Sequence, residues 1–151
     1  CEELIARCLA DGEELTYKCL TFRKEEIVLP SGMPMRYKNL RREKDEETGQ
    51  MAWVYEGPKS KSEKLYGGKI VNNLTQGVAR CVMTDGMLRV QDRHPVVGTV
   101  HDELLALVPE DDGEEELAWV LAQMTKEPKY LPGIPLAADG GSHKRYGLAK
   151  T

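Results

Sequence analysis

Residues 96–109 read VVGTVHDELLALVP, and this stretch decides how the second half of the chain folds. Two apolar runs in it flank three consecutive ionisable residues, His101, Asp102 and Glu103. Apolar runs separated by a short polar segment are typical of a β-hairpin. Ionised side chains are costly to bury, so they belong at the exposed tip of such a hairpin. We therefore predict strands at 95–100 and 104–109 with two carboxylates at the turn between them.

Asp102 and Glu103 allow two interpretations at this point. Carboxylates held at the edge of a core are the oxygen ligands that Mg²⁺ prefers, and this ion commonly takes one or two of them together with substrate phosphates. Acidic residues are also common in surface turns, where they only face water. Judged on the tripeptide by itself, the surface turn is the stronger interpretation.

A long helix is predicted over residues 70–90, IVNNLTQGVARCVMTDGMLRV. Its apolar residues recur at helical spacing and would form one side; they are Ile70, Leu74, Val78, Cys81 and Val82. Asn73, Gln76 and Arg80 share a different side. That side is either a solvated polar surface or a ligand-binding one. Gly77 and Gly86 within the helix would allow a neighbouring segment to approach closely.

The remaining pattern mixes short strands with two further helices. We predict helices at 1–10 and 113–124, the latter capped by Asp112 and buried through Leu117, Val120, Leu121 and Met124. Strands are predicted within 16–30, after a turn at Pro30-Ser31-Gly32, at 51–57 and at 133–140, with polar loops at 42–50 and 58–68. The order predicts an α+β fold: an antiparallel sheet with helices packed on one face.

Composition excludes several classes of protein. The chain has 151 residues and a net charge of −4, and no apolar run approaches the roughly 20 residues of a membrane span. Its 4 cysteines form no C-x-x-C pair, so neither a zinc cluster nor a disulfide framework is indicated and a cytoplasmic location is expected. Basic residues concentrate at 36–44 and 59–64 and acidic ones at 110–116, so one surface could meet phosphates.

Two segments together resemble a known family. YGGKIVNNLTQGVARCVMTDGMLRV (66–90) followed by VVGTVHDELLALVPED (96–111) resembles the C-terminal palm region of family A DNA polymerases, the DNA polymerase I family, and is most similar to its bacteriophage-type members. VHDEL (100–104) is similar to that family's motif C. IVLPSGMPMRY (27–37) and GIPLAADGGSHKRYGLAK (133–150) resemble further parts of the same region. The resemblance implies a partial palm subdomain at 23–151, preceded at 1–22 by the tail of a fingers-like helical segment.

The resemblance implies a role for each candidate residue. Asp102 would be the motif C aspartate that binds catalytic Mg²⁺, and Glu103 its acidic neighbour near the metals. His101 would lie near the 3′ end of the primer, and Gln76 with Asn73 or Asn72 would reach into the minor groove of the primer–template duplex. Lys69 and Arg80 would also contact DNA. The implied partners are primer–template DNA and a dNTP, and the implied location is the host cytoplasm if the protein is phage-encoded.

Two parts of the family's machinery are absent from the sequence. Motif A supplies the other metal-binding aspartate and motif B the residues that hold the incoming nucleotide, yet neither a DYS-like run nor an R-x-x-x-K-x-x-x-[FY]-G pattern occurs. One carboxylate cluster cannot hold two metal ions in the geometry of phosphoryl transfer. We therefore expect the chain by itself to be inactive, and to be one piece of a split polymerase or a truncated portion. An upstream half with motifs A and B would complete it.

Two other interpretations stay open. In the first, the chain is a non-catalytic DNA-binding or assembly module that keeps the palm fold, and its acids have no catalytic role. In the second, it is a different Mg²⁺-dependent phosphotransferase, in which Asp102 and Glu103 work with Asp85 or Asp92. The second is the weaker, because neither Asp85 nor Asp92 has a spacing that requires it.

Overall fold

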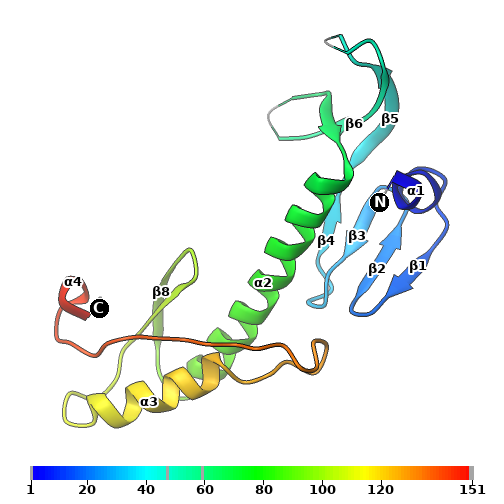
Figure 1. Ribbon diagram of the computed structural model, residues 1–151. Coiled ribbons are helices and arrows are strands. Elements are labelled where there is room, and N and C mark those ends of the chain that lie inside the picture. The colour runs from blue at the N-terminus through cyan, green and yellow to red at the C-terminus, as the bar shows by residue number, and fades with distance from the viewer. Residues whose placement is uncertain (1, 47, 59, 150–151) are drawn as a thin grey trace. The chain divides into compact units, whose positions relative to one another are not determined.

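The computed structural model describes residues 2–46, 48–58 and 60–149 (Figure 1). The outer ends of the predicted segments 1–22 and 23–151 lie outside the described residues. The chain divides into two compact units, residues 1–79 and 80–151. Within the described residues the strands form three antiparallel sheets accompanied by a few helices, so the predicted α+β class is confirmed. In the described ranges these three sheets are separate from one another.

The first unit begins with a helical segment and a four-stranded sheet. α1 (Glu2–Leu4) continues into the π-helical η1 (Ile5–Ala10), where a helix was predicted. The antiparallel strands follow in sequence order, β1 (Leu15–Tyr17), β2 (Leu20–Arg23), β3 (Glu26–Val28) and β4 (Pro34–Arg36). The predicted turn joins β3 to β4, with the Leu29 amide donating to the Met33 carbonyl at 3.0 Å and Gly32 at a φ of 80°.

A three-stranded antiparallel sheet completes the strands of this unit. It consists of β5 (Lys38–Lys44), β6 (Met51–Glu56) and β7 (Glu63–Leu65). The predictions of polar loops at 42–50 and 58–68 are wrong in part, because β5 and β7 extend into them. Charged residues are tolerated in β5 because their side chains reach solvent, and the Arg42 side chain lies opposite Trp53 of β6.

The core of the first unit is formed by η1, the sheets and the start of α2 (Gly67–Gln91). Its fully buried side chains include Ile5, Leu9 and Ile27, each 0% exposed. Ile70 of α2 is buried in this core and Leu74 packs against it, as the apolar spacing of the helix predicted. A Cβ at Gly77 would lie 3.1 Å from both a Leu29 methyl carbon and the Met35 sulfur, so the expected close approach at this glycine is confirmed.

The second unit contains the remainder of α2, a hairpin and two helices. The hairpin pairs β8 (Val96–Val100) with β9 (Glu103–Ala106), and α3 (Gly113–Met124) follows it. The predictions of β8 and α3 are confirmed, whereas the strand predicted at 104–109 is confirmed only in part, because β9 ends at Ala106. A short α4 (Tyr146–Ala149) lies near the end of the chain. Gly86 of α2 lies against Met124 of α3, since a Cβ there would come within 2.7 Å of the Met124 sulfur.

Two predictions in the second unit are wrong. Asp112 precedes α3 but its side chain makes no capping hydrogen bond, because its backbone dihedrals (φ −111°, ψ 15°) differ from the extended conformation of an N-cap. Residues 133–140 form no strand. Pro135 within this segment and Pro132 just before it have no amide proton to donate to a sheet, which explains the irregular conformation. Across the described residues, no helix combines the length and the apolar character that crossing a membrane requires.

Candidate functional site

The predicted carboxylates lie where the β8–β9 hairpin turns. Val100 pairs with Glu103, so His101 and Asp102 are the two residues of the turn itself. Asp102 is exposed, and within the described part of the chain its side chain makes no hydrogen bond or ion pair. A carboxylate at a tight turn is held by the backbone of both strands while its oxygens remain open to a ligand.

Glu103 is partly buried and is already engaged. The Tyr146 hydroxyl of α4 donates a hydrogen bond to Glu103 Oε2 over 2.9 Å. This contact ties the end of the chain to the hairpin and fixes one oxygen of the carboxylate. Asp102 and Glu103 are therefore not equivalent: the first is open on both oxygens, whereas the second shares one with a tyrosine.

Arg80 and His101 are brought together within the second unit. An Nη1 of Arg80 lies 3.5 Å from the His101 carbonyl oxygen, a long hydrogen bond between α2 and the turn. His101 has a positive φ of 53°, a conformation that residues other than glycine rarely adopt. Its side chain is exposed. Arg80 thus supports the strained backbone of the turn, and its remaining guanidinium donors stay available.

The amide side chains of α2 in the first unit divide into two kinds. Asn72 and Gln76 are exposed and lie one turn apart, with Gln76 Nε2 3.4 Å from Asn72 Oδ1. Asn73 is partly buried and donates to the Tyr37 hydroxyl at 3.3 Å. Burial raises the pKa of Tyr37, and the bond from Asn73 opposes part of that rise. Asn73 therefore supports the core, whereas Asn72 and Gln76 are exposed and bonded to each other, and the Asn72 amide nitrogen and the Gln76 amide oxygen lie outside that bond.

Lys69, at the start of α2, is held by an acid. Its Nζ lies 3.0 Å from Glu63 Oε2 and 5.0 Å from the centre of the Tyr55 ring. Burial by itself would lower the pKa of Lys69, but the hydrogen bonds and charges of Glu63 and Tyr55 outweigh it and the pKa is raised. Lys69 is thus cationic, yet most of its charge is balanced by Glu63. A contact with DNA would have to compete with this ion pair and stays a prediction.

Asp102 and Glu103 do not make a complete metal site on their own. Among the residues that the structure describes, no three His, Cys, Asp or Glu side chains are grouped closely enough to hold a metal ion. Two carboxylates nevertheless fit Mg²⁺ when substrate phosphates or another segment supply the remaining oxygens. The donor set is hard and anionic, and it lacks the thiolate or imidazole pairs that favour zinc.

The phosphotransferase interpretation gains no support from Asp85 or Asp92. Asp85 accepts a hydrogen bond from the Tyr130 hydroxyl at 2.7 Å, which gives it a structural role within the second unit. Asp92 follows the last residue of α2, and its amide donates to the Leu88 carbonyl. In the described ranges neither joins Asp102 and Glu103 in an acidic group.

Sequence reasoning missed a buried charged cluster in the second unit. Glu116 of α3 accepts hydrogen bonds from Arg93 and from His94, whose Nε2 lies 2.6 Å from Glu116 Oε2. Burial alone would raise the pKa of Glu116, but the bond from His94 and the charge of Arg93 outweigh it and the pKa is lowered. The Trp119 ring contacts both donors: it lies edge-to-face with the His94 ring, with 5.5 Å between the ring centres, and its centre is 4.8 Å from the Arg93 guanidinium carbon. The burial of Glu116 could have been predicted from its position, because it lies one turn before Val120 on the side of α3 that was expected to be buried.

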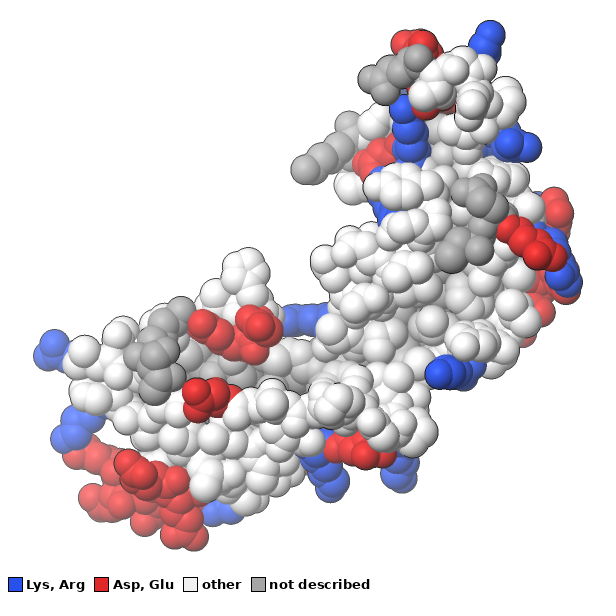
Figure 2. Space-filling view, in the orientation of Figure 1, with Lys and Arg blue, Asp and Glu red and all other residues white. Residues whose placement is uncertain are grey.

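The other acids near the start of α3 behave differently. Acidic side chains gather over that end of the helix in Figure 2. The exposed members of this group are Glu110, Asp111, Asp112, Glu114 and Glu115. They form a solvated anionic surface, which would repel phosphates, so a nucleic acid would bind elsewhere.

Comparison with known proteins finds one informative relationship. No protein-family model and no solved structure matches the chain. It is 37% identical over 131 residues to the DNA polymerase of Bacillus phage SP02. The match takes in 80% of this chain but only 20% of that protein, so the chain spans about a fifth of the relative's length. The chain is therefore related to part of a phage DNA polymerase.

Proposed function

We propose that the chain is the C-terminal palm portion of a bacteriophage-type family A DNA polymerase and serves template-directed nucleotidyl transfer. The observation that carries the proposal is the 37% identity, over 80% of the chain, to a phage DNA polymerase. The hairpin with Asp102 at its turn supports the motif C assignment, because it leaves one carboxylate rigidly placed and open. In this proposal, residues 1–22 are the tail of a fingers-like helical segment and residues 23–151 belong to the palm.

Asp102 and Glu103 are the groups that would hold Mg²⁺. Bound divalent ions would neutralise charge on the attacking 3′-oxygen of the primer and on the leaving pyrophosphate. Asp102 contributes an exposed carboxylate, whereas one oxygen of Glu103 already accepts the hydrogen bond of the Tyr146 hydroxyl. This difference makes Asp102 the principal ligand and Glu103 the auxiliary one.

The polar side of α2 and the turn would contact the primer–template duplex. Every base pair presents acceptors in the minor groove, so the amide donors of Gln76 and Asn72 can test the shape of a duplex without reading its sequence. Asn73 would act through Tyr37 rather than directly. Arg80 and Lys69 would contact the backbone, and the exposed His101 side chain would lie near the primer end.

An upstream portion with motifs A and B would complete the site and hold the dNTP. The β8–β9 sheet supports this part of the proposal, since a two-stranded hairpin is marginally stable by itself. Apolar side chains of β8 are also open, with Val97 59% and Val100 41% exposed, and so is Leu107, which directly follows β9 and is 59% exposed. Exposed apolar surface of this kind marks a place for another segment. That segment can belong to the same polypeptide or to a separate chain.

Reconstitution of primer extension tests the proposal. The chain is mixed or co-expressed with a segment that carries motifs A and B of a bacteriophage-type family A polymerase, and extension of a labelled primer is measured with Mg²⁺ and dNTPs. We expect no extension from either piece separately and extension from the mixture. Failure of every mixture, with both pieces folded, would count against the proposal and favour a non-catalytic DNA-binding or assembly module.

A further inference from the structure

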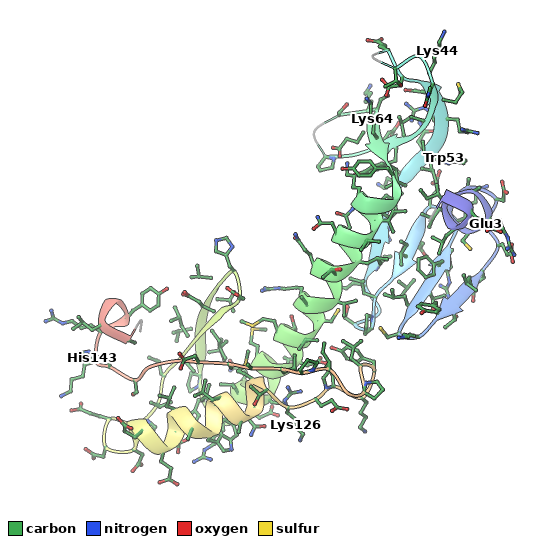
Figure 3. All side chains as sticks on the ribbon, viewed as in Figure 1. Glu3, Lys44, Trp53, Lys64, Lys126 and His143 are labelled. Carbon is green, nitrogen blue, oxygen red and sulfur yellow. The ribbon has the colours of Figure 1, made fainter. Side chains whose placement is uncertain are left out.

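One face of the β5–β6 hairpin combines two cations with two apolar side chains. Arg42 pairs directly with Trp53, and Lys44 pairs directly with Met51. Directly opposed residues point to the same side of a sheet, as do residues two apart on one strand. These four residues therefore form one surface, here called the Arg42 face. Figure 3 labels Trp53 on β6 and Lys44 at the far end of β5.

Arg42 is positioned on this face before any ligand binds. Its guanidinium carbon lies 5.6 Å from the centre of the Trp53 ring, and its Nη2 donates to the Met51 carbonyl at 3.3 Å. These contacts restrict a long side chain, so less conformational entropy is lost when it binds a ligand. A guanidinium has five donors in total, which leaves several for a ligand.

The charges of the Arg42 face are unbalanced, whereas those on the other side of the sheet are balanced. Arg41 lies opposite Val54 on the other side and is paired with Glu43 at 2.6 Å. Lys64, also opposite Val54, is paired with Asp45 at 2.8 Å. Within the described residues, neither Arg42 nor Lys44 has a carboxylate partner. The net positive charge of the hairpin is thus concentrated on one face.

The apolar members of the face differ in exposure. Met51 is 52% exposed, whereas Trp53 is partly buried and packs against the core of the first unit with the rest of its surface. Cations alone would suit any polyanion, but among nucleic acids an aromatic ring beside them gains most contact area from unpaired bases, which can stack on it. A duplex keeps its bases stacked inside and offers such a surface mainly its phosphates.

We propose that the Arg42 face binds single-stranded nucleic acid, with Arg42 and Lys44 on the phosphates and Met51 and Trp53 against the bases. The proposal deepens the proposed function, on which it rests for its biological setting, because it adds a second contact with the polynucleotide. It involves none of the residues assigned to metal or minor-groove binding.

The test measures binding of a short fluorescein-labelled oligothymidylate to the full chain by fluorescence anisotropy, without Mg²⁺ or dNTP. Arg42→Gln/Lys44→Gln removes both cations of the face. Arg41→Gln/Lys64→Gln removes the same charge from the other side of the sheet and is the matched control. Met51→Ser tests the apolar part at an exposed position and remains informative if the first double variant fails to fold. Circular dichroism establishes folding of each variant.

We expect Arg42→Gln/Lys44→Gln to weaken binding about fivefold or more. The same variant should reduce the slope of log K against log salt by about 1.4, because each phosphate contact on a single strand contributes about 0.7 and two contacts are lost. Met51→Ser should weaken binding of the oligothymidylate more than binding of a blunt duplex of equal length, and Arg41→Gln/Lys64→Gln should retain most of the affinity. Equal losses in both double variants, equal effects on duplex and single strand, or no binding by the unmodified chain at low salt would each overturn the proposal.

This experiment is independent of catalysis. Oligonucleotide binding without reconstituted extension would contradict the proposed function alone, and extension without face-dependent binding would contradict the Arg42 face alone.

Discussion

At the scale of single residues, the backbone of His101 carries local strain. Its φ of 53° places it in the left-handed region, which costs a residue with a Cβ about 1 kcal/mol or more. The hydrogen bond from Arg80 to its carbonyl, together with the pairing of Val100 with Glu103, holds the turn in this conformation. Strain of this kind often accompanies functional turns, because it fixes the neighbouring side chains.

Replacement of His101 tests this strain. His101→Gly should be more stable than His101→Ala by roughly 0.5–1 kcal/mol, since both variants lack the imidazole but only glycine adopts the left-handed conformation freely. The free energy of unfolding is measured in urea for the two variants side by side. Equal stability of the glycine and alanine variants would show that the turn is unstrained.

The buried Glu116 makes stability depend on pH. Its pKa lies below the usual value of about 4.3, so the folded state binds this proton less readily than the unfolded state does. The resulting stabilisation is present above the unfolded pKa and is lost as the pH falls through the folded pKa. The urea midpoint of the unmodified chain should therefore be lower at strongly acidic pH than at neutral pH. The difference between the two midpoints should be smaller for Glu116→Gln.

Glu115→Gln is the matched control for this titration. Glu115 lies beside Glu116 in the first turn of α3, but its side chain is exposed. Its replacement should leave the pH dependence of the midpoint nearly unchanged. If Glu115→Gln and Glu116→Gln alter the pH dependence equally, the cluster with Arg93 and His94 does not carry the effect.

At the scale of elements, Gly86 of α2 permits the packing of α3. Gly86→Ala would gain about 1 kcal/mol of helix propensity, yet its Cβ would lie 2.7 Å from the Met124 sulfur and 3.3 Å from the Met124 Cα. Overpacking of this kind costs about 1–3 kcal/mol. We expect a net loss of roughly 1 kcal/mol in urea unfolding. In a Met124→Ala background, which lacks the sulfur, Gly86→Ala should be nearly neutral or stabilising. If Gly86→Ala lowers the free energy of unfolding in that background as well, the packing explanation is contradicted.

The elements that the sequence could predict are those with a clear apolar period. The helix at 70–90 and the hairpin around residues 100–104 were predicted because their apolar residues recur regularly and a polar turn separates the strands. β5 was missed in part because its far end, Arg42–Lys44, is charged and stays in a sheet through cross-strand contacts such as Arg42 with Trp53. Such contacts depend on which strand lies opposite, and no local pattern encodes that.

At the scale of the whole molecule, the candidate site could be predicted only where one short segment supplies it. Asp102 and Glu103 are adjacent in the chain, so a turn suffices to bring them together. The pairing of His94 with Glu116 joins residues separated by 22 positions, and only the packing of α3 creates it. The remaining ligands of the proposed metal site would come from a segment with motif A, which this sequence does not contain.

The proposal that the chain is one portion of a polymerase explains two observations. The chain matches a fifth of a phage polymerase, and apolar side chains of the β8–β9 sheet are exposed. The chain folds into units with their own buried residues, and in the proposed function the Asp102 carboxylate acts only when another segment of a polymerase packs beside it. Under that proposal, a substitution of Asp102 would abolish primer extension by the reconstituted complex without unfolding the chain.

The most direct measurement compares primer extension by the reconstituted complex with Asp102→Asn and with Asp111→Asn. Both substitutions remove one exposed carboxylate from the second unit, but only Asp102 lies at the hairpin turn. We predict that Asp102→Asn lowers extension more than about 100-fold while primer–template binding is retained, and that Asp111→Asn extends like the unmodified complex. Undiminished extension by Asp102→Asn would contradict the assignment of this carboxylate as the metal ligand.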